Sequence, residues 1–209
     1  MGALLVKRLD DALRDGDSIR AIIRETGVNQ NGKTPSITAP QQAAQEALIR
    51  QCYERVNLDP AQTTYVEAHG TGTPAGDPLE VGALAAALGG SRSAEHPLYL
   101  GSIKANIGHT EAASGVASVI KVALALEKGQ IPPNTQLNTP NSELRLNDRN
   151  MEVGYNTLFG RKLSCERLCL NRFLYQRKDG LWGRVPDVPP STISVLAVAM
   201  LMPFWNRPR

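Results

Sequence analysis

The chain is poor in cysteine and has no long apolar run. Its 209 residues contain three cysteines, too few for a disulfide framework, so a reducing compartment and a cytoplasmic location are expected. The N-terminus offers only a four-residue apolar run before Lys7, which does not resemble a signal peptide. The apolar stretch at 193–205 is shorter than the roughly 20 residues of a membrane span. We therefore expect no membrane association.

Tryptophan, phenylalanine and an excess of positive charge are found only near the end of the chain. Both tryptophans and all three phenylalanines lie after residue 154. Residues 1–154 carry 14 Lys and Arg against 17 Asp and Glu, a net charge of −3, whereas residues 155–209 carry 9 against 3, a net charge of +6. A nucleic-acid-binding surface on the main body is therefore not expected. The change in composition predicts that residues 154–209 form an unrelated tail of irregular structure.

Strand and helix patterns alternate along the main body. Strands are expected at 3–9, 17–28, 63–68 and 97–103, and helices at 41–56, 77–88 and 112–126. Such alternation is typical of an α/β fold with a mixed, mostly parallel sheet. Asp77, Pro78 and Glu80 resemble a helix start, in which Asp77 caps the helix and Glu80 reaches back to its first turn. The helix at 112–126 is expected to be largely buried, because few polar residues interrupt it.

Two histidines occupy matching positions in this pattern. His69 and His109 each follow the carboxyl end of an expected strand and precede a helix. In open α/β sheets, ligands bind just outside those carboxyl ends. The positive potential of a helix N-terminus favours a neutral imidazole that can donate a hydrogen bond. Two such donors that converge on one point suit a developing oxyanion or enolate, although a single histidine at a strand end is more often structural.

Small and hydroxyl-bearing residues surround both histidines. Gly70 and Gly108 allow a substrate to approach the backbone closely. Thr71 and Thr73 offer hydroxyl groups to an amide-bearing ligand. Both turns therefore have the composition of a binding site.

Two charged residues flank the second histidine. Lys104 precedes His109 by five residues, and Glu111 is its nearby candidate partner. A role in the site and a place on the surface both remain open for Lys104. The third histidine, His96, lies beside a proline in a loop and is expected on the surface. Because the histidines do not have metal-ligand spacing, no metal site is expected.

Residues 27–34 match the phosphate-loop pattern G-x-x-x-x-G-K-[ST]. A phosphate loop must lead straight into a helix, whose N-terminus helps to bind the phosphates. Here Pro35 and Pro40 intervene. Nucleotide binding through a P-loop is therefore a remote alternative.

The two histidine segments together resemble one family. VEAHGTGTPAGDPLEVGAL and GSIKANIGHTEAASGVASVIKVALALEKGQIPPN closely resemble the ketosynthase domain of type I polyketide synthases, and residues 1–153 resemble the C-terminal part of that domain. The resemblance implies a thiolase-like fold and a decarboxylative Claisen condensation of a malonyl-type extender with an acyl thioester. It implies no directly bound cofactor, because an acyl carrier protein presents the extender on phosphopantetheine. It also implies a homodimer or pairing with a ketosynthase-type subunit.

The resemblance also implies roles for individual residues. His69 and His109 fall on the two catalytic histidines of the family, and Lys104 falls on its lysine. The residues expected to contact substrate or pantetheine lie in the same two turns: Thr71, Thr73, Gly70, Gly108 and Asn106. Glu111 is expected to support this group.

Two family features are absent from these 209 residues. One is the acidic-Thr-Ala-Cys-Ser segment that carries the nucleophile, and the other is the Gly-Phe-Gly-Gly-Thr-Asn strand expected after residue 153. Cys52 lies on the apolar face of an expected helix, and Cys165 and Cys169 lie in the tail, so each is interpreted as a structural or incidental thiol. The chain is therefore expected to be a truncated, inactive acyltransferase. The alternative is a non-catalytic remnant that binds acyl-carrier pantetheine or pairs with a ketosynthase subunit.

Overall fold

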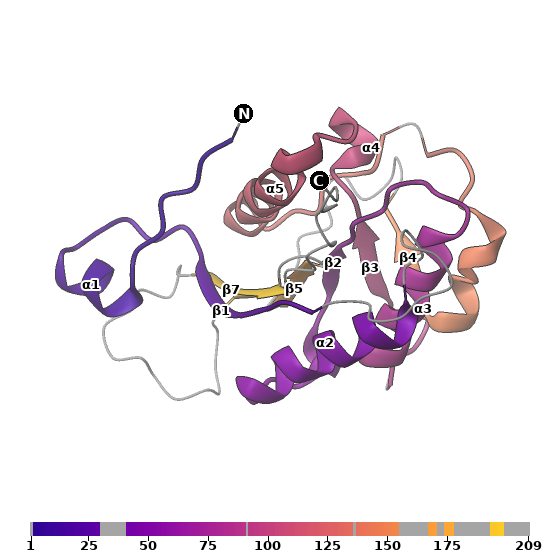
Figure 1. Cartoon of the computed structure of the whole chain (residues 1–209), viewed down its shortest axis with the longest axis horizontal. Coiled ribbons are helices and arrows are strands. Elements are labelled where there is room, and N and C mark those ends of the chain that lie inside the picture. Colours follow the sequence, from indigo (N-terminus) through magenta and orange to yellow (C-terminus); the bar gives the residue numbers. More distant parts are fainter. Residues whose placement is uncertain are drawn as a thin grey trace, which may run out of the picture.

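A central sheet with helices on both faces organises the protein (Figure 1). The computed structural model describes residues 2–29, 41–90, 92–135 and 137–154, and the backbone of residues 167–170, 174–177 and 193–198. In Figure 1 the longest helix, α5 (Ser114–Lys128), covers one face of the sheet. Helices α2 (Gln42–Arg55) and α3 (Gly76–Leu88) cover the opposite face. The α/β fold predicted from the sequence is therefore confirmed.

The described residues contribute seven strands to the sheet, in the order β1-β7-β6-β5-β2-β3-β4. The strands of the main body are β1 (Ile22–Gly27), β2 (Tyr65–Glu67), β3 (Leu98–Gly101) and β4 (Met151–Val153). The strands of the tail are β5 (Arg167–Leu170), β6 (Leu174–Arg177) and β7 (Ile193–Val198). Strand β6 runs antiparallel to its neighbours, and the other pairings are parallel. The sheet is therefore mostly parallel, as expected.

Shorter helices connect these elements. They are α1 (Leu9–Arg14), α4 (Lys104–Ile107), and the 3₁₀ turns η1 (Pro60–Gln62), η2 (Glu111–Ala113), η3 (Ser142–Leu144) and η4 (Asn147–Arg149). Gly129 ends α5 in the left-handed conformation, which glycine adopts without steric cost. Among the helices in the described part of the chain, none has the length and apolar character that a bilayer crossing requires.

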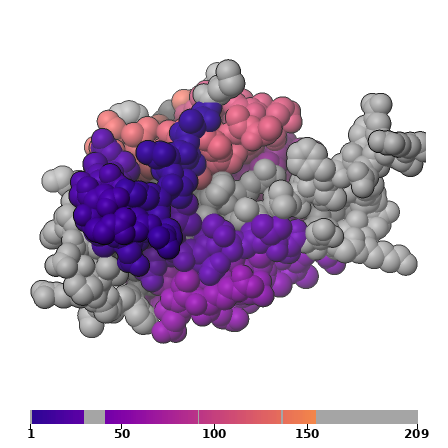
Figure 2. Space-filling view, turned by 60° about the vertical axis from the view of Figure 1, so that its left-hand side comes forward, coloured from indigo at the N-terminus to yellow at the C-terminus, as the bar shows by residue number. Residues whose placement is uncertain are grey.

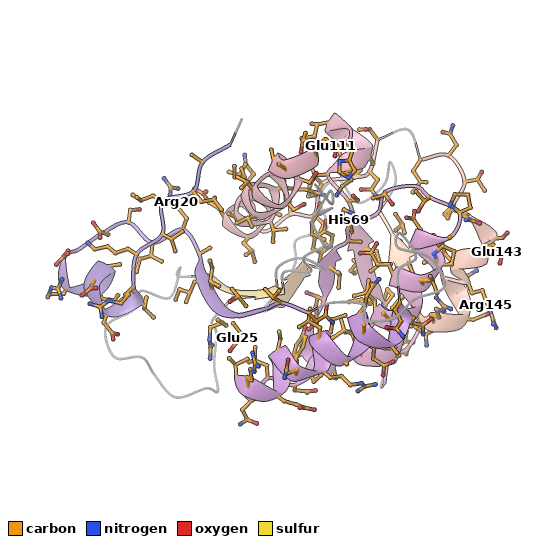
Figure 3. The ribbon with its side chains drawn as sticks, viewed as in Figure 1. Arg20, Glu25, His69, Glu111, Glu143 and Arg145 are labelled. Carbon is orange, nitrogen blue, oxygen red and sulfur yellow. The ribbon has the colours of Figure 1, made fainter. Side chains whose placement is uncertain are left out.

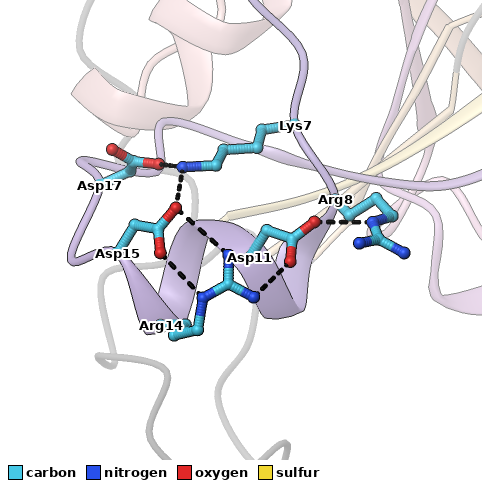
Figure 4. A network of polar contacts seen from close by, with 6 residues as sticks. All are labelled: Lys7, Arg8, Asp11, Arg14, Asp15 and Asp17. Carbon is cyan, nitrogen blue, oxygen red and sulfur yellow. Dashed lines mark hydrogen bonds and ion pairs between the residues drawn. The ribbon is translucent and has the colours of Figure 1, made fainter.

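The N-terminal segment departs from the expected strand at 3–9. Residues 2–8 have no regular structure, and helix α1 begins at Leu9. Charged side chains around α1 form a surface network: Lys7, Arg8, Asp11, Arg14, Asp15 and Asp17 (Figure 4). Pairs at i and i+3 support a helix rather than a strand. Figure 2 shows these indigo residues on the outside of the molecule.

The tail departs from the expected irregular structure in three segments, since β5, β6 and β7 are strands of the sheet. Strand β5 lies directly beside β2, with residue 168 opposite Tyr65 and residue 170 opposite Glu67. Three short extended segments can join a sheet because its strand edges offer unpaired N–H and C=O groups. That the tail is unrelated to the main body stays a prediction.

The core has one apolar cluster on each face of the sheet. Adjacent residues of β2 show the division, because Val66 packs with α2 and α3 while Tyr65 packs with α5. Helix α5 is mostly buried or half-buried, as expected, although Leu124 is 46% exposed. The polar residues that interrupt its apolar sequence are on the buried side: Ser114, Ser118 and Lys121. Lys121 is therefore buried between α5 and the sheet, near the edge that carries both histidines.

Candidate active site

The sheet brings the two histidines together. Strands β2 and β3 are parallel neighbours, with Glu67 opposite Gly101, so both end at the same edge. His69 follows β2 directly, and His109 follows β3 and the short helix α4. Their ring centroids are 5.7 Å apart, and the ring planes are nearly perpendicular at 81°. In Figure 3, Glu111 lies above His69 at this end of the sheet.

The loop that carries His69 is fixed by a buried glutamate. Glu80 Oε1 accepts the backbone N–H of His69 at 2.6 Å, and Glu80 Oε2 accepts that of Gly70 at 2.9 Å. Glu80 is only 6% exposed. The sequence suggested that Glu80 reaches back to the start of its own helix, and in the structure its carboxylate accepts two N–H groups of the preceding loop.

Gly70 brings the His69 loop close to the next strand. Its φ of +47° lies in the left-handed region, and an added Cβ would be 2.8 Å from Ser102 Cβ. The Ser102 hydroxyl lies 3.3 Å from the carbonyl oxygen of His69 and 3.4 Å from that of Gly70. A side chain at residue 70 would separate the two loops, so Gly70 supports the backbone as well as substrate access.

The two threonines lie at the entrance to α3. Their hydroxyl oxygens are 3.3 Å apart, and Thr73 Oγ1 accepts the N–H of Gly76 at 3.1 Å. Thr73 therefore satisfies the first helical N–H group, whereas the sequence assigned the capping role to Asp77. Thr71 is half-buried and Thr73 is exposed, so both are near the surface at the site.

Asp77 turns toward the loop instead of capping the helix. Both of its carboxylate oxygens lie 3.2 Å from the N–H of Gly72. Burial raises the pKa of Asp77, while backbone hydrogen bonds from the loop and the charge of Lys104 oppose that rise. The charge of Lys104, which belongs to the second loop, is the smallest of the effects that lower the pKa of Asp77.

The ring of His109 is oriented by the backbone of the residues that follow it. Its Nδ1 accepts the N–H of Glu111 at 3.0 Å, and the hydroxyl of Ser114 lies 3.4 Å from the same nitrogen. Because Nδ1 accepts an N–H, the proton of the neutral ring lies on Nε2. Glu111 reaches this position with a φ of +49°. The arrangement leaves one N–H of the ring as a hydrogen-bond donor.

The side chain of Glu111 lies beside His109. Its Oε1 lies 3.6 Å from His109 Nδ1, and the side chain is 89% exposed. The structure thus places Glu111 beside His109, whereas the sequence suggested Lys104 as its partner.

A neighbouring segment fixes the turn that carries Lys104. Asn134 Oδ1 accepts the N–H of Ser102 at 3.1 Å, and Thr135 donates its hydroxyl to the carbonyl of Ala105 at 2.7 Å. The amide of Asn106 donates to the carbonyl of Pro133 at 3.1 Å. This amide is therefore engaged with the protein, although Asn106 was expected to contact pantetheine. Gly108 ends α4 with a φ of +75° and redirects the chain toward His109.

The remaining candidates lie away from these loops. Cys52 is fully buried in α2, and burial raises the pKa of its thiol to about 11, as suits a structural residue. Cys165 lies outside the described residues, and only the backbone of Cys169 is described. His96 is on the surface, as expected. The described part of the chain shows no cluster of three His, Cys, Asp or Glu side chains suited to a metal ion.

The P-loop alternative lies largely outside the described residues. Its first residue, Gly27, ends β1, and an added Cβ there would be 2.5 Å from the sulfur of Cys52. Residues 30–40 are not described, so nucleotide binding at this segment stays a prediction without structural support.

Sequence reasoning assigned no role in the site to the residues that support both loops: Glu67, Glu80, Ser102, Lys121 and Asn134. Two of them carried a signal. Glu67 follows two buried residues in a short strand, and Lys121 interrupts an apolar helix. Opposite charges in two buried elements predict an ion pair, because isolated buried charges are costly.

Comparison with known protein families identifies the family of this chain. The family described as "Beta-ketoacyl synthase, C-terminal domain" matches residues 20–138, more than half of the chain. The chain belongs to the β-ketoacyl synthase family. The match includes both histidine loops, the helices α2 to α5 and strands β1 to β3, so the described site lies within the family domain.

Curated relatives of this β-ketoacyl synthase chain are much longer. The chain is 97% identical over 157 residues to the highly reducing polyketide synthase azaB of Aspergillus niger, covering 75% of the chain and 6% of the relative. It is 61% identical over 153 residues to the compactin diketide synthase mlcB of Penicillium citrinum, covering 73% of the chain and again 6% of the relative. The chain thus spans a small part of the synthases that it resembles.

Solved ketosynthases share the fold. The ketosynthase from module 6 of the bacillaene synthase of Bacillus subtilis 168 gives a TM-score of 0.69 at 36% identity, over 81% of this chain and 30% of that chain. The oxazolomycin ketosynthase domain OzmH KS7 of Streptomyces albus gives 0.70 at 32% identity, with the same two coverages. The thiolase-like fold expected from the sequence is confirmed, and the chain corresponds to a C-terminal portion of a ketosynthase domain.

Proposed function

We propose that this chain supplies the histidine half of a β-ketoacyl synthase active site in polyketide biosynthesis. The observation that carries the proposal is the 5.7 Å separation of the His69 and His109 rings at one sheet edge. Two imidazole N–H donors at that spacing can share one thioester oxygen. The fixed orientation of His109, whose Nδ1 already accepts the N–H of Glu111, supports a donor role for its Nε2.

The proposed step is decarboxylation of a malonyl-type thioester followed by condensation. The bond between the carboxylate and the α-carbon breaks, carbon dioxide leaves, and the electron pair moves onto the thioester enolate. His69 and His109 stabilise the enolate oxygen through their N–H groups. The α-carbon then attacks an acyl thioester, a carbon–carbon bond forms, and the thiolate leaves and takes up a proton.

The neighbouring residues are assigned by their positions around the histidines. Lys104 is proposed to act through charge, since it already influences Asp77 on the facing loop. Thr71 and Thr73, with Gly70 and Gly108, are proposed to contact the phosphopantetheine arm of an acyl carrier domain. The partners are then this carrier and acyl and malonyl-type thioesters, and the synthase is expected to be dimeric.

A second candidate function is non-catalytic binding of acyl-carrier pantetheine or pairing with a ketosynthase subunit. This function is favoured by the environment of Cys52, the cysteine whose side chain the structure describes. Cys52 is buried, and burial raises the pKa of its thiol to about 11. We infer that the 209 residues alone form no acyl-enzyme and that the nucleophile comes from another segment or chain. Incubation with a radiolabelled acyl thioester tests this inference. Labelled protein that loses its label when one of its cysteines is replaced by serine would contradict it.

A chimera tests the catalytic proposal directly. The 157-residue segment shared with the Aspergillus niger synthase is replaced in that synthase by the segment of this chain, and decarboxylation of a malonyl carrier is measured. His69→Ala and His109→Ala are each expected to lower the rate by about 100-fold or more, because each removes an oxyanion donor. His96→Ala, on the surface, is the matched control. Full activity in either site variant would refute the proposal.

A further inference from the structure

A buried ion pair lies beneath the two histidine loops. Glu67 Oε2 is 2.6 Å from Lys121 Nζ, and the side chains are 0% and 7% exposed. Glu67 is the last residue of β2, and Lys121 lies in the middle of α5. Burying two charges costs several kcal/mol of desolvation per ion, so such a pair is weak evidence for stability alone. The proposed chemistry uses neither residue.

The carboxylate of Glu67 binds three separate elements. Its Oε2 accepts the hydroxyl of Tyr65 at 2.5 Å in addition to the ammonium of Lys121. Its Oε1 accepts the backbone N–H of Ile103 at 2.6 Å. Strand β2, helix α5 and the turn after β3 therefore meet at one side chain.

The bond to Ile103 connects Glu67 to the second histidine loop. The carbonyl of Ile103 accepts the N–H groups of Asn106 and Ile107, so this residue begins α4. Lys104 is the next residue, and α4 leads through Gly108 to His109. A shift of the Ile103 backbone would therefore move the whole turn.

The same carboxylate lies at the base of the first loop. Glu67 precedes His69 by two residues, and Ser102, next to Ile103, contacts the carbonyls of His69 and Gly70. Gly101 lies opposite Glu67 in the sheet, and a Cβ added there would overlap the hydroxyl of Tyr65. The two loops thus share one attachment point.

We propose that Glu67 is a positioning residue, whose acceptor bond to the Ile103 N–H sets the relative placement of His69 and His109, with Lys121 as its countercharge. The inference rests on the proposed function of the two histidines. It assigns the carboxylate a role in catalytic geometry, and it makes the acceptor atom, rather than the charge, the important feature.

Two double variants in the chimera separate the acceptor from the charge. The first, Glu67→Gln with Lys121→Met, removes both charges, but the amide oxygen that it introduces still accepts the Ile103 N–H. The second, Glu67→Met with Lys121→Met, removes both charges and the acceptor. Because a misplacement of about 1 Å can cost about 100-fold in rate, we expect the second double variant to have a kcat at least tenfold below that of the first. KM for the malonyl carrier should be the same in both, because the threonines are unchanged.

Glu67→Asp is the third variant, since it keeps the charge but withdraws the carboxylate from Ile103 by one methylene. It is expected to lower kcat and, again, not KM. If the variant with both methionines does not fold, the aspartate variant decides the question. Wild-type kcat for Glu67→Asp, or equal kcat for the two folded double variants, would overturn the inference.

A spectroscopic measurement on the 209-residue chain complements the kinetics. With ¹⁵N-labelled histidine, the ring nitrogen shifts report the tautomers of His69 and His109, and exposed His96 is an internal reference. The shifts should change in the second double variant and be retained in the first. The histidine-to-alanine variants distinguish the two proposals: if they remain active, the proposed function fails, and if they are inactive while all Glu67 variants match the wild type, only this inference fails.

Discussion

Each histidine loop has a glutamate beside it, but one glutamate contacts its loop through a buried side chain and the other through its backbone N–H. Glu80 is 6% exposed, and its carboxylate accepts the N–H groups of His69 and Gly70. The side chain of Glu111 is 89% exposed, and its backbone N–H contacts His109. The first loop is thus held by a side chain of α3, whereas the ring of His109 is oriented by a backbone N–H two residues further along its own loop.

The comparison extends to the other contacts of the two loops. The first loop is attached to α3 by carboxylates, Glu80 and Asp77. The second loop is attached to residues 133–135 through neutral amide, carbonyl and hydroxyl groups, and to one carboxylate, Glu67, through the N–H of Ile103. Charge-assisted hydrogen bonds are about twice as strong as neutral ones. Because two carboxylates hold the first loop and one holds the second, we expect the first loop to be more sensitive to both substitution and pH.

The largest effect is expected for Glu80→Ala. The change removes the acceptor of two loop N–H groups at once and leaves both in a partly buried position. Loss of hydrogen bonds to a charged group should lower the free energy of unfolding by about 3 kcal/mol. Urea unfolding of the chain measures this, and the chimera should lose most of its decarboxylation activity.

Glu46→Ala is the matched control for Glu80→Ala. Glu46 pairs with Arg50 within α2, at i and i+4. Such pairs contribute about 0.3–0.5 kcal/mol, so little change is expected. Equal destabilisation by the two substitutions would mean that Glu80 has no special role in the first loop.

A smaller effect is expected for Asn134→Ala in the second loop. Asn134 is buried, and its Oδ1 accepts the N–H of Ser102. One unsatisfied buried donor should cost about 1–3 kcal/mol, measured by urea unfolding. Exposed Asn138 lies in the same segment, and its substitution by alanine should have little effect. A loss larger than that of Glu80→Ala would reverse the order of the two loops.

Much of the fold was predictable because its local signals agree with its tertiary contacts. Helix α2 follows the expected i, i+4 face, with Leu48 and Cys52 buried, and α5 ends at Gly129 as expected. The prediction of a strand at 3–9 was wrong, because an apolar run of four residues does not determine secondary structure by itself. The strands of the tail were not predictable, since short segments pair according to the available edges rather than their composition.

The site was predictable only in part. His69 and His109 were found because parallel strands that end together carry their loops to one edge. The supporting contacts could not be assigned in the same way, because Glu80 and Asp77 match a helix-start pattern and bond instead to the preceding loop. A capping pattern identifies suitable acceptors, but the donors that they bind depend on the path of the loop.

Glu111→Gly should have a modest and favourable effect on stability. Glu111 has a φ of +49°, a conformation that costs a non-glycine residue about 1–2 kcal/mol. Since glycine also has more conformational entropy to lose, the net gain in the free energy of unfolding should be at most about 1 kcal/mol. Glu127→Gly, near the end of α5, should instead cost about 1 kcal/mol, because glycine disfavours the helix and the ion pair with Arg20 is lost. A clear destabilisation by Glu111→Gly would show that its exposed carboxylate matters to the second loop.

The smallest effect concerns Asp77 and its pH dependence. Burial raises the pKa of Asp77, so the folded state favours the protonated carboxyl more than the unfolded state does. Its contribution to stability is therefore fully present below the unfolded pKa of 3.8 and is lost as the pH rises through the raised folded pKa. Asp77→Asn removes this titration. The free energy of unfolding of the wild type, relative to that of Asp77→Asn, should increase as the pH falls from about 7 toward about 4, and a difference that is constant with pH would show that the carboxylate is fully compensated by Gly72 and Lys104.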